Sequence, residues 1–303
     1  MPTSLLDRAR RQPWLVLILQ QTTVFALVVA FMKGVVPLID PQLRSGRTPL
    51  GPTALLATVL AYGLMVLVSR GLYHWSQGAD APALGLAPSR GSLGQHLVGL
   101  LLGFALTSWD LWLGLAAGTI RVTDSLPRHF PPGALVLVVL MAFTSLTLNS
   151  LNEEACSRAV PLGLVRRSPL WARVLLPALV FSLLHVAVEP FRLEAFLLRT
   201  LSGVAFSVAY LLTRDIWFAA GLHTGQNAGV LLGTGRWYLG GLLVVEGERW
   251  GGAWAQPAVH VLLTLAGLWV LYRREAPAAP ATPAPPEGVK ELAPDTGTPL
   301  RTL

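Results

Sequence analysis

Long apolar segments alternate with short polar ones along the 303 residues of this chain. Most of the apolar segments are about 17–25 residues long, the length that a helix needs to cross the hydrocarbon core of a bilayer. The segments between them, such as 121–132 and 233–252, are rich in Gly, Pro or charged residues, which predicts loops. Hydropathy gives eight candidate spans, at 14–32, 52–69, 94–118, 133–165, 170–188, 192–212, 216–232 and 257–272. We therefore predict an all-α, polytopic membrane protein, a bundle of about eight transmembrane helices.

Composition supports the same fold class. Hydrophobic residues make up 53% of the chain and charged residues 13%, with a mean hydropathy of +0.56. A soluble domain usually carries about 25% charged residues, so we exclude a soluble globular protein. The net charge of +7 comes from Lys and Arg in the loops, where such residues set membrane orientation. Basic residues form no stripe interleaved with aromatic residues, so we expect no nucleic-acid partner.

The two ends of the chain predict its orientation. Arg8, Arg10 and Arg11 precede the first apolar segment, and Lys33-Gly34 follows it in place of a small-residue cleavage site, so we expect a retained first span. A modest Lys/Arg excess places both termini in the cytoplasm of a multi-pass protein, as in a bacterial plasma membrane. We predict a transmembrane domain over 1–275 and a disordered, Pro/Ala-rich cytoplasmic tail over 276–303.

Ionisable side chains inside the predicted spans are the first candidates for chemistry, because each is costly to bury unless it is paired or hydrated. One cluster contains Glu153, Glu154 and Arg158. Glu154 and Arg158 are four residues apart on one helix face, a spacing that predicts a salt bridge. Glu153 is left without an obvious local partner. An ion pair solvated at the helix end is the alternative interpretation.

Two further motifs contain histidine. His185 follows Phe181 by four residues, and Asn227 follows His223 by four, so each pair lies on one helix face. Alone, each histidine could be a hydrogen-bonded packing residue. Counting about 1.5 Å per residue from the turns that share one membrane face puts Glu153 at ~20 Å, His185 at ~24 Å and Asn227 at ~18 Å of depth. This agreement in depth favours a single site built by three helices.

The three motifs resemble those of the CAAX-prenyl-protease and bacteriocin-processing (CPBP, or Abi) family, which includes the Ras-converting endopeptidase. The family pattern is Glu-Glu-x-x-x-Arg, then Phe-x-x-x-His, then His-x-x-x-Asn. It matches Glu153, Glu154, Arg158, Phe181, His185, His223 and Asn227. The resemblance covers about 140–232, which we predict to be the peptidase-like core. It implies an intramembrane endopeptidase acting on a membrane-associated protein or peptide, with the helix braced by Glu154 and Arg158.

The resemblance also implies roles for the remaining motif residues. Glu153 and His185 would activate a water molecule for attack on a peptide carbonyl, and a carboxylate is a stronger base in a low dielectric than in water. His223 and Asn227 would stabilise the oxyanion, where hydrogen-bond donors in a dry site are worth most. Cys156 could be a thiol nucleophile paired with His185, although the family pattern leaves its position free.

The sequence does not decide whether the protein uses a metal cofactor. The family is described both as metal-dependent and as a glutamate peptidase, and Glu153, His185 and His223 could form a two-His, one-carboxylate site for zinc or another divalent metal. The chain has no His-Glu-x-x-His motif, and Asn is a poor zinc ligand, so we favour a mechanism without a metal or other cofactor.

Two other functions remain as alternatives. One is a non-catalytic immunity or scaffold protein that binds a peptide or partner helix in the same pocket. The other is a small transporter in which intramembrane Glu and His relay protons. An inverted repeat would favour a transporter, and the sequence shows none. Two further polar positions are expected to serve packing: Asp110 by pairing across helices, and Gln20 with Gln21 by hydrogen bonds to neighbouring helices.

Overall fold

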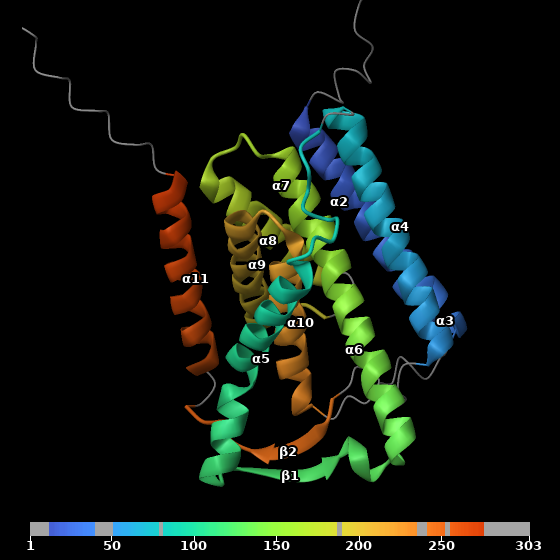
Figure 1. The fold of residues 1–303 in the computed structure, drawn as a ribbon, viewed down its shortest axis with the longest axis vertical. Helices are drawn as coiled ribbons and strands as arrows, with labels where there is room; N and C mark the ends of the chain where they lie inside the picture. Colours follow the sequence, from blue (N-terminus) through green and yellow to red (C-terminus); the bar gives the residue numbers. More distant parts are fainter. Residues whose placement is uncertain are drawn as a thin grey trace, which may run out of the picture.

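The computed structural model describes residues 12–39, 51–78, 81–186, 190–234, 241–251 and 255–275. Over these residues the chain forms eight helical stretches that stand as a bundle, with a two-stranded sheet at one end (Figure 1). The predicted all-α bundle of about eight helices is thus confirmed. The predicted tail over 276–303 lies outside the described residues.

The predicted spans correspond one to one with helical stretches. In chain order these are α2 (Pro13–Ala30) continued by the π-helix η1 (Phe31–Val35) and α3 (Val36–Ile39), α4 (Pro52–Gln77), α5 (Ser92–Ala117), α6 (Pro132–Glu154) continued by the π-helix η4 (Ala155–Ala159) and α7 (Val160–Leu164), α8 (Leu170–Val186), α9 (Leu193–Thr213), α10 (Ile216–Leu232) and α11 (Ala255–Glu275). Within the described residues, six stretches are long and apolar enough to cross a membrane. The other two, α8 and α10, have 17 residues each.

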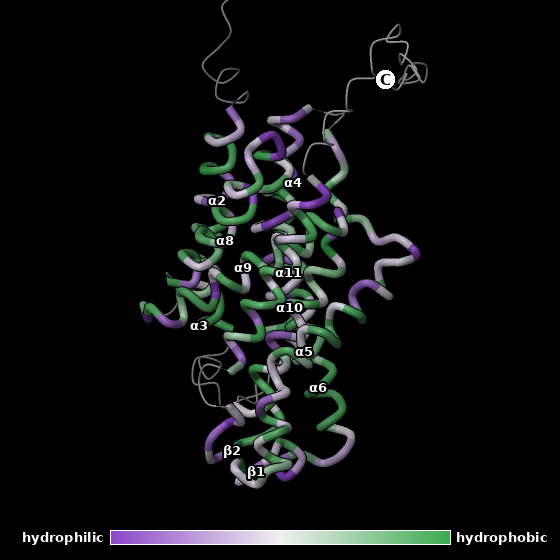
Figure 2. Tube along the Cα trace, turned by 90° about the vertical axis from the view of Figure 1, so that its left-hand side faces the viewer, coloured by the Kyte–Doolittle hydropathy of each residue, from purple (hydrophilic) through white to green (hydrophobic). Residues whose placement is uncertain are grey.

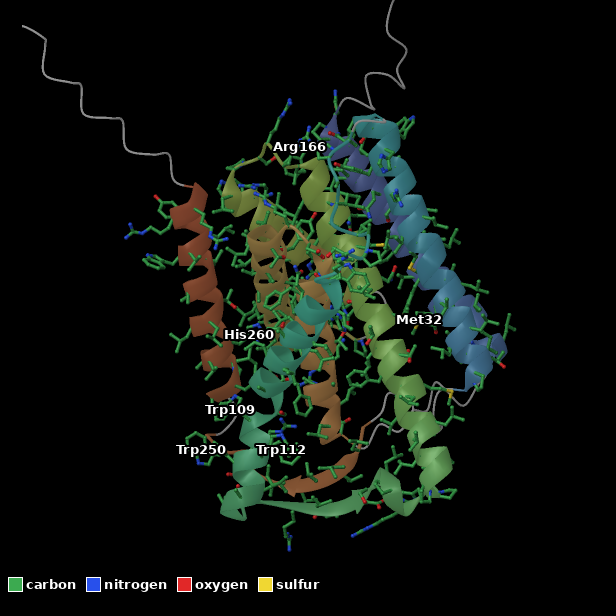
Figure 3. The ribbon with its side chains drawn as sticks, in the orientation of Figure 1. Met32, Trp109, Trp112, Arg166, Trp250 and His260 are labelled. Atoms are coloured by element: carbon green, nitrogen blue, oxygen red, sulfur yellow. The ribbon has the colours of Figure 1, made fainter. Side chains whose placement is uncertain are left out.

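The outer surface of the bundle is apolar, as a lipid-facing surface must be. Leu60 and Leu67 of α4 and Leu262 of α11 are at least 65% exposed. Figure 2 shows hydrophobic residues along the helices and hydrophilic ones mainly in the connections between them. Trp109 and Trp250 lie in contact near the sheet end of the bundle (Figure 3), and tryptophan is enriched at membrane–water interfaces.

The start of α2 and the end of α11 lie at the same end of the bundle, as an even number of spans requires (Figure 1). Arg166, in the turn between α7 and α8, lies at this same end (Figure 3). The opposite end carries the sheet. That the end with α2 and α11 faces the cytoplasm stays a prediction.

The sheet corrects the expectation of loops at 121–132 and 233–252. Strand β1 (Ile120–Ser125) pairs antiparallel with β2 (Leu243–Gly247), with an irregularity in register between Val122 and Asp124. A short 3-10 turn, η3 (Leu126–Arg128), follows β1. Each strand is short, and its partner lies more than a hundred residues away. Neither segment alone therefore carries a signal that separates it from a loop.

Helices α5 and α10 pack more closely than any ordinary side chain would allow. The contact is lined by Gly99, Gly103, Gly221, Gly225 and Gly229. A Cβ atom added at Gly225 would meet the backbone of Leu100, and one added at Gly221 would meet that of His96. Small residues of this kind let membrane helices approach backbone to backbone. This contact fixes the position of α10, the helix that carries His223 and Asn227.

Candidate active site

The helix that carries both glutamates changes its winding immediately after them. α6 ends at Glu154, and the π-helix η4 separates it from α7. Pro161 accounts for the change, because proline lacks an N–H and its ring crowds the carbonyl four residues earlier. The N–H of Val160 accordingly reaches back to the carbonyl of Ala155. The π-helix η1 stands in the same relation to Pro37. Such π segments are frequent at functional sites.

Glu154 is the centre of a buried ionic network. Its Oε1 accepts a hydrogen bond from Nη1 of Arg158 at 3.2 Å and lies 2.9 Å from Nδ1 of His223. Glu154 and Arg158 have no exposed surface, and His223 is 5% exposed. The predicted salt bridge between residues 154 and 158 is therefore confirmed. Glu154 has a second partner, His223, that the spacing did not reveal, and this contact joins the end of α6 to α10.

Two phenylalanine rings enclose the charged groups. The guanidinium of Arg158 lies over the ring of Phe181 at 4.1 Å and 5.2 Å from that of Phe206. Phe206 also stacks on the imidazole of His223 at 4.5 Å, while Phe181 meets that imidazole edge-on at 5.9 Å. Cation–π contacts stabilise a desolvated guanidinium, and the stacking fixes the plane of the imidazole. Phe206 belongs to α9, and no sequence motif marked it.

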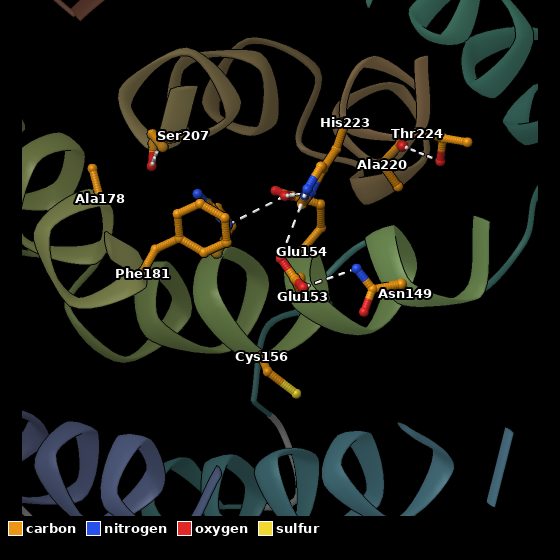
Figure 4. Close-up of polar contacts among 12 residues, drawn as sticks. Asn149, Glu153, Glu154, Cys156, Ala178, Phe181, Ser207, Ala220, His223 and Thr224 are labelled. Atoms are coloured by element: carbon orange, nitrogen blue, oxygen red, sulfur yellow. Dashed lines mark hydrogen bonds and ion pairs between the residues drawn. The ribbon is translucent and has the colours of Figure 1, made fainter. Parts of the chain in front are cut away.

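Glu153 is held differently from its neighbour (Figure 4). Its Oε1 accepts a hydrogen bond from Nδ2 of Asn149 at 2.9 Å. Its Oε2 faces Nε2 of His223 at 3.7 Å, and this oxygen is buried with no hydrogen-bond partner among the described residues. The side chain is 23% exposed. The expectation that Glu153 has no local partner is wrong, because Asn149 precedes it by the same four-residue spacing that pairs Glu154 with Arg158.

His185 and Asn227 lie at the edge of this arrangement. The ring of His185 meets that of Phe181 at 4.7 Å, and its Nδ1 is 2.8 Å from the carbonyl of Phe181. Phe181 thus lies between His185 and His223. Asn227 is half-buried one turn after His223, and its side chain forms no hydrogen bond within the part of the chain that the structure describes. Of the residues predicted to converge, Glu153 and Glu154 both lie next to His223. His185 is separated from His223 by the ring of Phe181.

Other polar residues singled out in the sequence lie outside this set. The thiol of Cys156 points away from the histidines, towards α2 and α4 (Figure 4), and lies 3.5 Å from Oγ of Ser69. Its direction argues against a nucleophile paired with His185. Asp110 pairs with Arg249 at 3.2 Å, so its partner is in the segment after β2 and not on a neighbouring helix. Gln20 and Gln21 do bond to neighbouring helices, as expected.

The arrangement does not fit the two-His, one-carboxylate metal site considered above. Across the described ranges, no three His, Cys, Asp or Glu side chains are gathered so that they could hold one ion. A zinc site needs its ligands together within about 2.0–2.3 Å of the metal. We therefore derive no step through a metal.

An apolar helical bundle that encloses two carboxylates, a guanidinium and an imidazole defines a polytopic membrane protein with a site inside its helices. Comparison with protein-family models finds a similarity for the segment that carries this site. Residues 135–229 match the model described as Type II CAAX prenyl endopeptidase Rce1-like. The matched segment runs from α6 into α10 and includes all seven motif residues. The resemblance seen in the sequence is therefore confirmed for this segment, which is similar to Rce1-like endopeptidases. Searches of curated proteins and of solved structures gave no match.

Proposed function

We propose that this protein is an intramembrane endopeptidase in which Glu153 is the general base. The observation that supports the proposal most is the asymmetry of the Glu153 carboxylate. One oxygen is bound by Asn149, whereas the other is buried, has no hydrogen-bond partner among the described residues and faces His223. A carboxylate oxygen in this position can accept a proton from a water molecule placed beside it.

In the proposed reaction, Glu153 takes a proton from a water molecule that His185 helps to orient. The resulting hydroxide oxygen adds to the peptide carbonyl and forms a tetrahedral intermediate. Glu153 then gives its proton to the leaving amine as the carbon–nitrogen bond breaks. The reaction consumes one water and leaves Glu153 ionised again, so no cofactor is needed. General acid–base catalysis of this kind contributes about 10²–10⁴-fold to a rate.

His223 and Asn227 would donate hydrogen bonds to the oxyanion of the intermediate. Glu154 holds Nδ1 of His223, which leaves Nε2 as the nitrogen directed to the side of Glu153. When both ring nitrogens carry hydrogen, the imidazolium and the guanidinium of Arg158 balance the two carboxylates. Nε2 is then a donor in a dry site, where such a donor contributes most to catalysis.

We further propose that the substrate is a membrane-anchored peptide with a prenylated CAAX end. The family description names CAAX prenyl endopeptidases, and a CAAX sequence is a C-terminal motif in which the cysteine carries the prenyl chain. A site that lies between the helices of a membrane bundle suits a substrate that is itself held in the bilayer. We also propose that the protein lies in the plasma membrane with both termini in the cytoplasm.

The test is Glu153→Gln, which keeps the volume of the side chain but cannot accept the proton. Turnover of an internally quenched, farnesylated CAAX peptide by the detergent-solubilised protein should fall about 10²–10⁴-fold. The melting temperature should hardly change, because an uncharged amide is easier to bury than a carboxylate. Asp110→Asn is the matched control, since it changes another buried carboxylate of the bundle, and it should keep its turnover.

Two results would overturn parts of the proposal. Near wild-type turnover in Glu153→Gln means that Glu153 is not the base. Binding of the peptide without cleavage by the wild-type protein favours a non-catalytic immunity or scaffold protein. Proteomics of membranes from a deletion strain then decides independently of the chosen peptide, because an endopeptidase leaves an uncut precursor when it is absent.

A further inference from the structure

A chain of two hydrogen bonds reaches Glu153 from a helix outside the family match. The hydroxyl of Tyr62, on α4, donates to Oδ1 of Asn149 at 2.6 Å. Nδ2 of Asn149, on α6, donates to Oε1 of Glu153 at 2.9 Å. Tyr62 lies well before residue 135, where the Rce1-like match begins. The match therefore says nothing about this contact.

The order of donors and acceptors in this chain gives it a direction. A carboxamide has an acceptor end and a donor end, and either can face a neighbour. A tyrosine hydroxyl bound to Oδ1 leaves the NH₂ group of Asn149 facing the carboxylate. Without that hydroxyl the amide could turn, and its carbonyl oxygen would then face Glu153, where two acceptors repel. The hydroxyl of Tyr62 thus fixes the end of Asn149 that Glu153 meets.

The hydrogen bond from Asn149 in turn selects the reactive oxygen of Glu153. Because Oε1 is bound, the carboxylate cannot rotate freely about its last bond. Oε2 is thereby kept on the side of His223. A base acts efficiently only when its accepting atom is within hydrogen-bond reach of the proton, so this restriction on rotation bears directly on the rate.

We propose that Tyr62 and Asn149 are positioning residues that hold Glu153 in its reactive orientation, with Tyr62 acting through Asn149. The inference rests on the proposed function, since it assigns a role towards the same base. It also gives α4 a part in the reaction, although the family match does not cover this helix.

Four variants of the full-length protein test the inference: Tyr62→Phe, Asn149→Ala, the double variant, and Tyr73→Phe as a control. Tyr73 is on the same helix, and Tyr73→Phe also removes one part-buried hydroxyl hydrogen bond, to the carbonyl of Pro82 at 2.9 Å. We expect kcat to fall about 10- to 100-fold in Asn149→Ala, the rate equivalent of one hydrogen bond to a charged group. Tyr62→Phe should fall about 3- to 10-fold, as for a bond between neutral groups.

Two readouts separate positioning from a merely structural role. The KM for the quenched peptide should stay near the wild-type value in both single variants, because neither residue is proposed to bind substrate. The double variant should be no slower than Asn149→Ala within about twofold, because Tyr62 has no route to Glu153 once the amide is gone. Tyr73→Phe should keep its kcat.

The possible failures are distinct. If the losses in Tyr62→Phe and Asn149→Ala multiply in the double variant, Tyr62 acts independently and the chain is wrong. If both single variants keep their kcat while Glu153→Gln abolishes turnover, the inference fails and the proposed function stands. If Glu153→Gln itself keeps its turnover, Glu153 is not the base, and the assignment of Tyr62 and Asn149 as its positioning residues fails with it.

Discussion

The helix formed by α6 and η4 has two faces that hold polar groups in different ways. The face towards α8, α9 and α10 carries charge: Glu154 and Arg158 are fully buried, paired with each other and enclosed by aromatic rings. On the face towards α2 and α4, the polar groups that the structure describes near Cys156 are neutral, and the carbonyl of Cys156 accepts from both Gln20 and Gln21. Figure 4 shows the two directions, with the glutamates turned towards His223 and the thiol of Cys156 turned away.

The two faces differ in what their polar groups have to do. A buried charge costs several kcal/mol unless it is paired, so charge is kept where the proposed chemistry needs it. On the neutral face, side chains provide hydrogen bonds to a backbone carbonyl, that of Cys156. The π-helix directs the N–H of Val160 to Ala155, and Pro161 has no N–H to offer to the carbonyl of Cys156. The glutamine side chains supply the missing donors. The comparison predicts large effects from changes on the charged face and small ones on the neutral face.

The largest effect is expected from Glu154→Gln, which leaves Arg158 without a carboxylate partner in the bundle. Removing one partner of a buried ion pair costs about 3–5 kcal/mol, so the yield of folded protein and its melting temperature should both fall. Asp110→Asn should cost much less, because the side chain of Arg249 is 33% exposed and can turn towards water. Detergent-solubilised yield and thermal unfolding measure both.

Equal losses in Glu154→Gln and Asp110→Asn would contradict the idea that the charged face depends on its dry pairing. The pair Glu154→Gln and Glu153→Gln also separates structure from chemistry. The first should lower folded yield, whereas the second should lower turnover with little change in yield.

A smaller effect is expected where α10 is seated against α5. Gly225→Ala places a methyl group against the backbone of Leu100 and Phe104, which cannot move aside as a flexible side chain would. Overpacking typically costs about 1–3 kcal/mol, and we expect a loss at the upper end of that range together with lower activity as His223 shifts. Gly63→Ala on α4 is the control, because nothing lies within 4 Å of its added methyl. It should be neutral or stabilising by up to about 1 kcal/mol. A stable, active Gly225→Ala would show that the contact between α5 and α10 is not tightly packed.

Much of the fold could be predicted because membrane helices are a local property. Length and hydropathy located every helical stretch of the described residues. They carry no information on winding, so the π-helix before Pro161 was not predicted. The strands at 120–125 and 243–247 could not be found in this way, since their pairing joins distant segments. Hydropathy describes each segment in isolation and carries no information on such partners.

The site was predictable where its residues share a helix and unpredictable where they do not. The pairing of Glu154 with Arg158 follows from four-residue spacing, and the same rule applied to Asn149 would have found the partner of Glu153. Phe206 and Tyr62 are different, because each contacts the site from another helix: Phe206 from α9 and Tyr62 from α4. Nothing in their own segments distinguishes them from other aromatic residues of a bundle.

The smallest effect is expected on the neutral face, from Gln20→Leu and Gln21→Leu. Each single variant leaves one glutamine amide on the carbonyl of Cys156. Interhelical hydrogen bonds in membrane proteins average about 0.6 kcal/mol and reach about 1.7 kcal/mol. Gln21→Leu removes one such bond and should cost about the average, whereas Gln20→Leu also removes the bond to Ser69 and should cost about twice as much. The double variant removes both donors and leaves a buried carbonyl without a partner, which costs about 1–3 kcal/mol more than a satisfied one. Its loss in melting temperature should therefore exceed the sum of the two single losses. Strictly additive losses would mean that the two glutamines do not share the carbonyl. In either single variant a loss as large as that of Glu154→Gln would erase the distinction between the two faces of the helix.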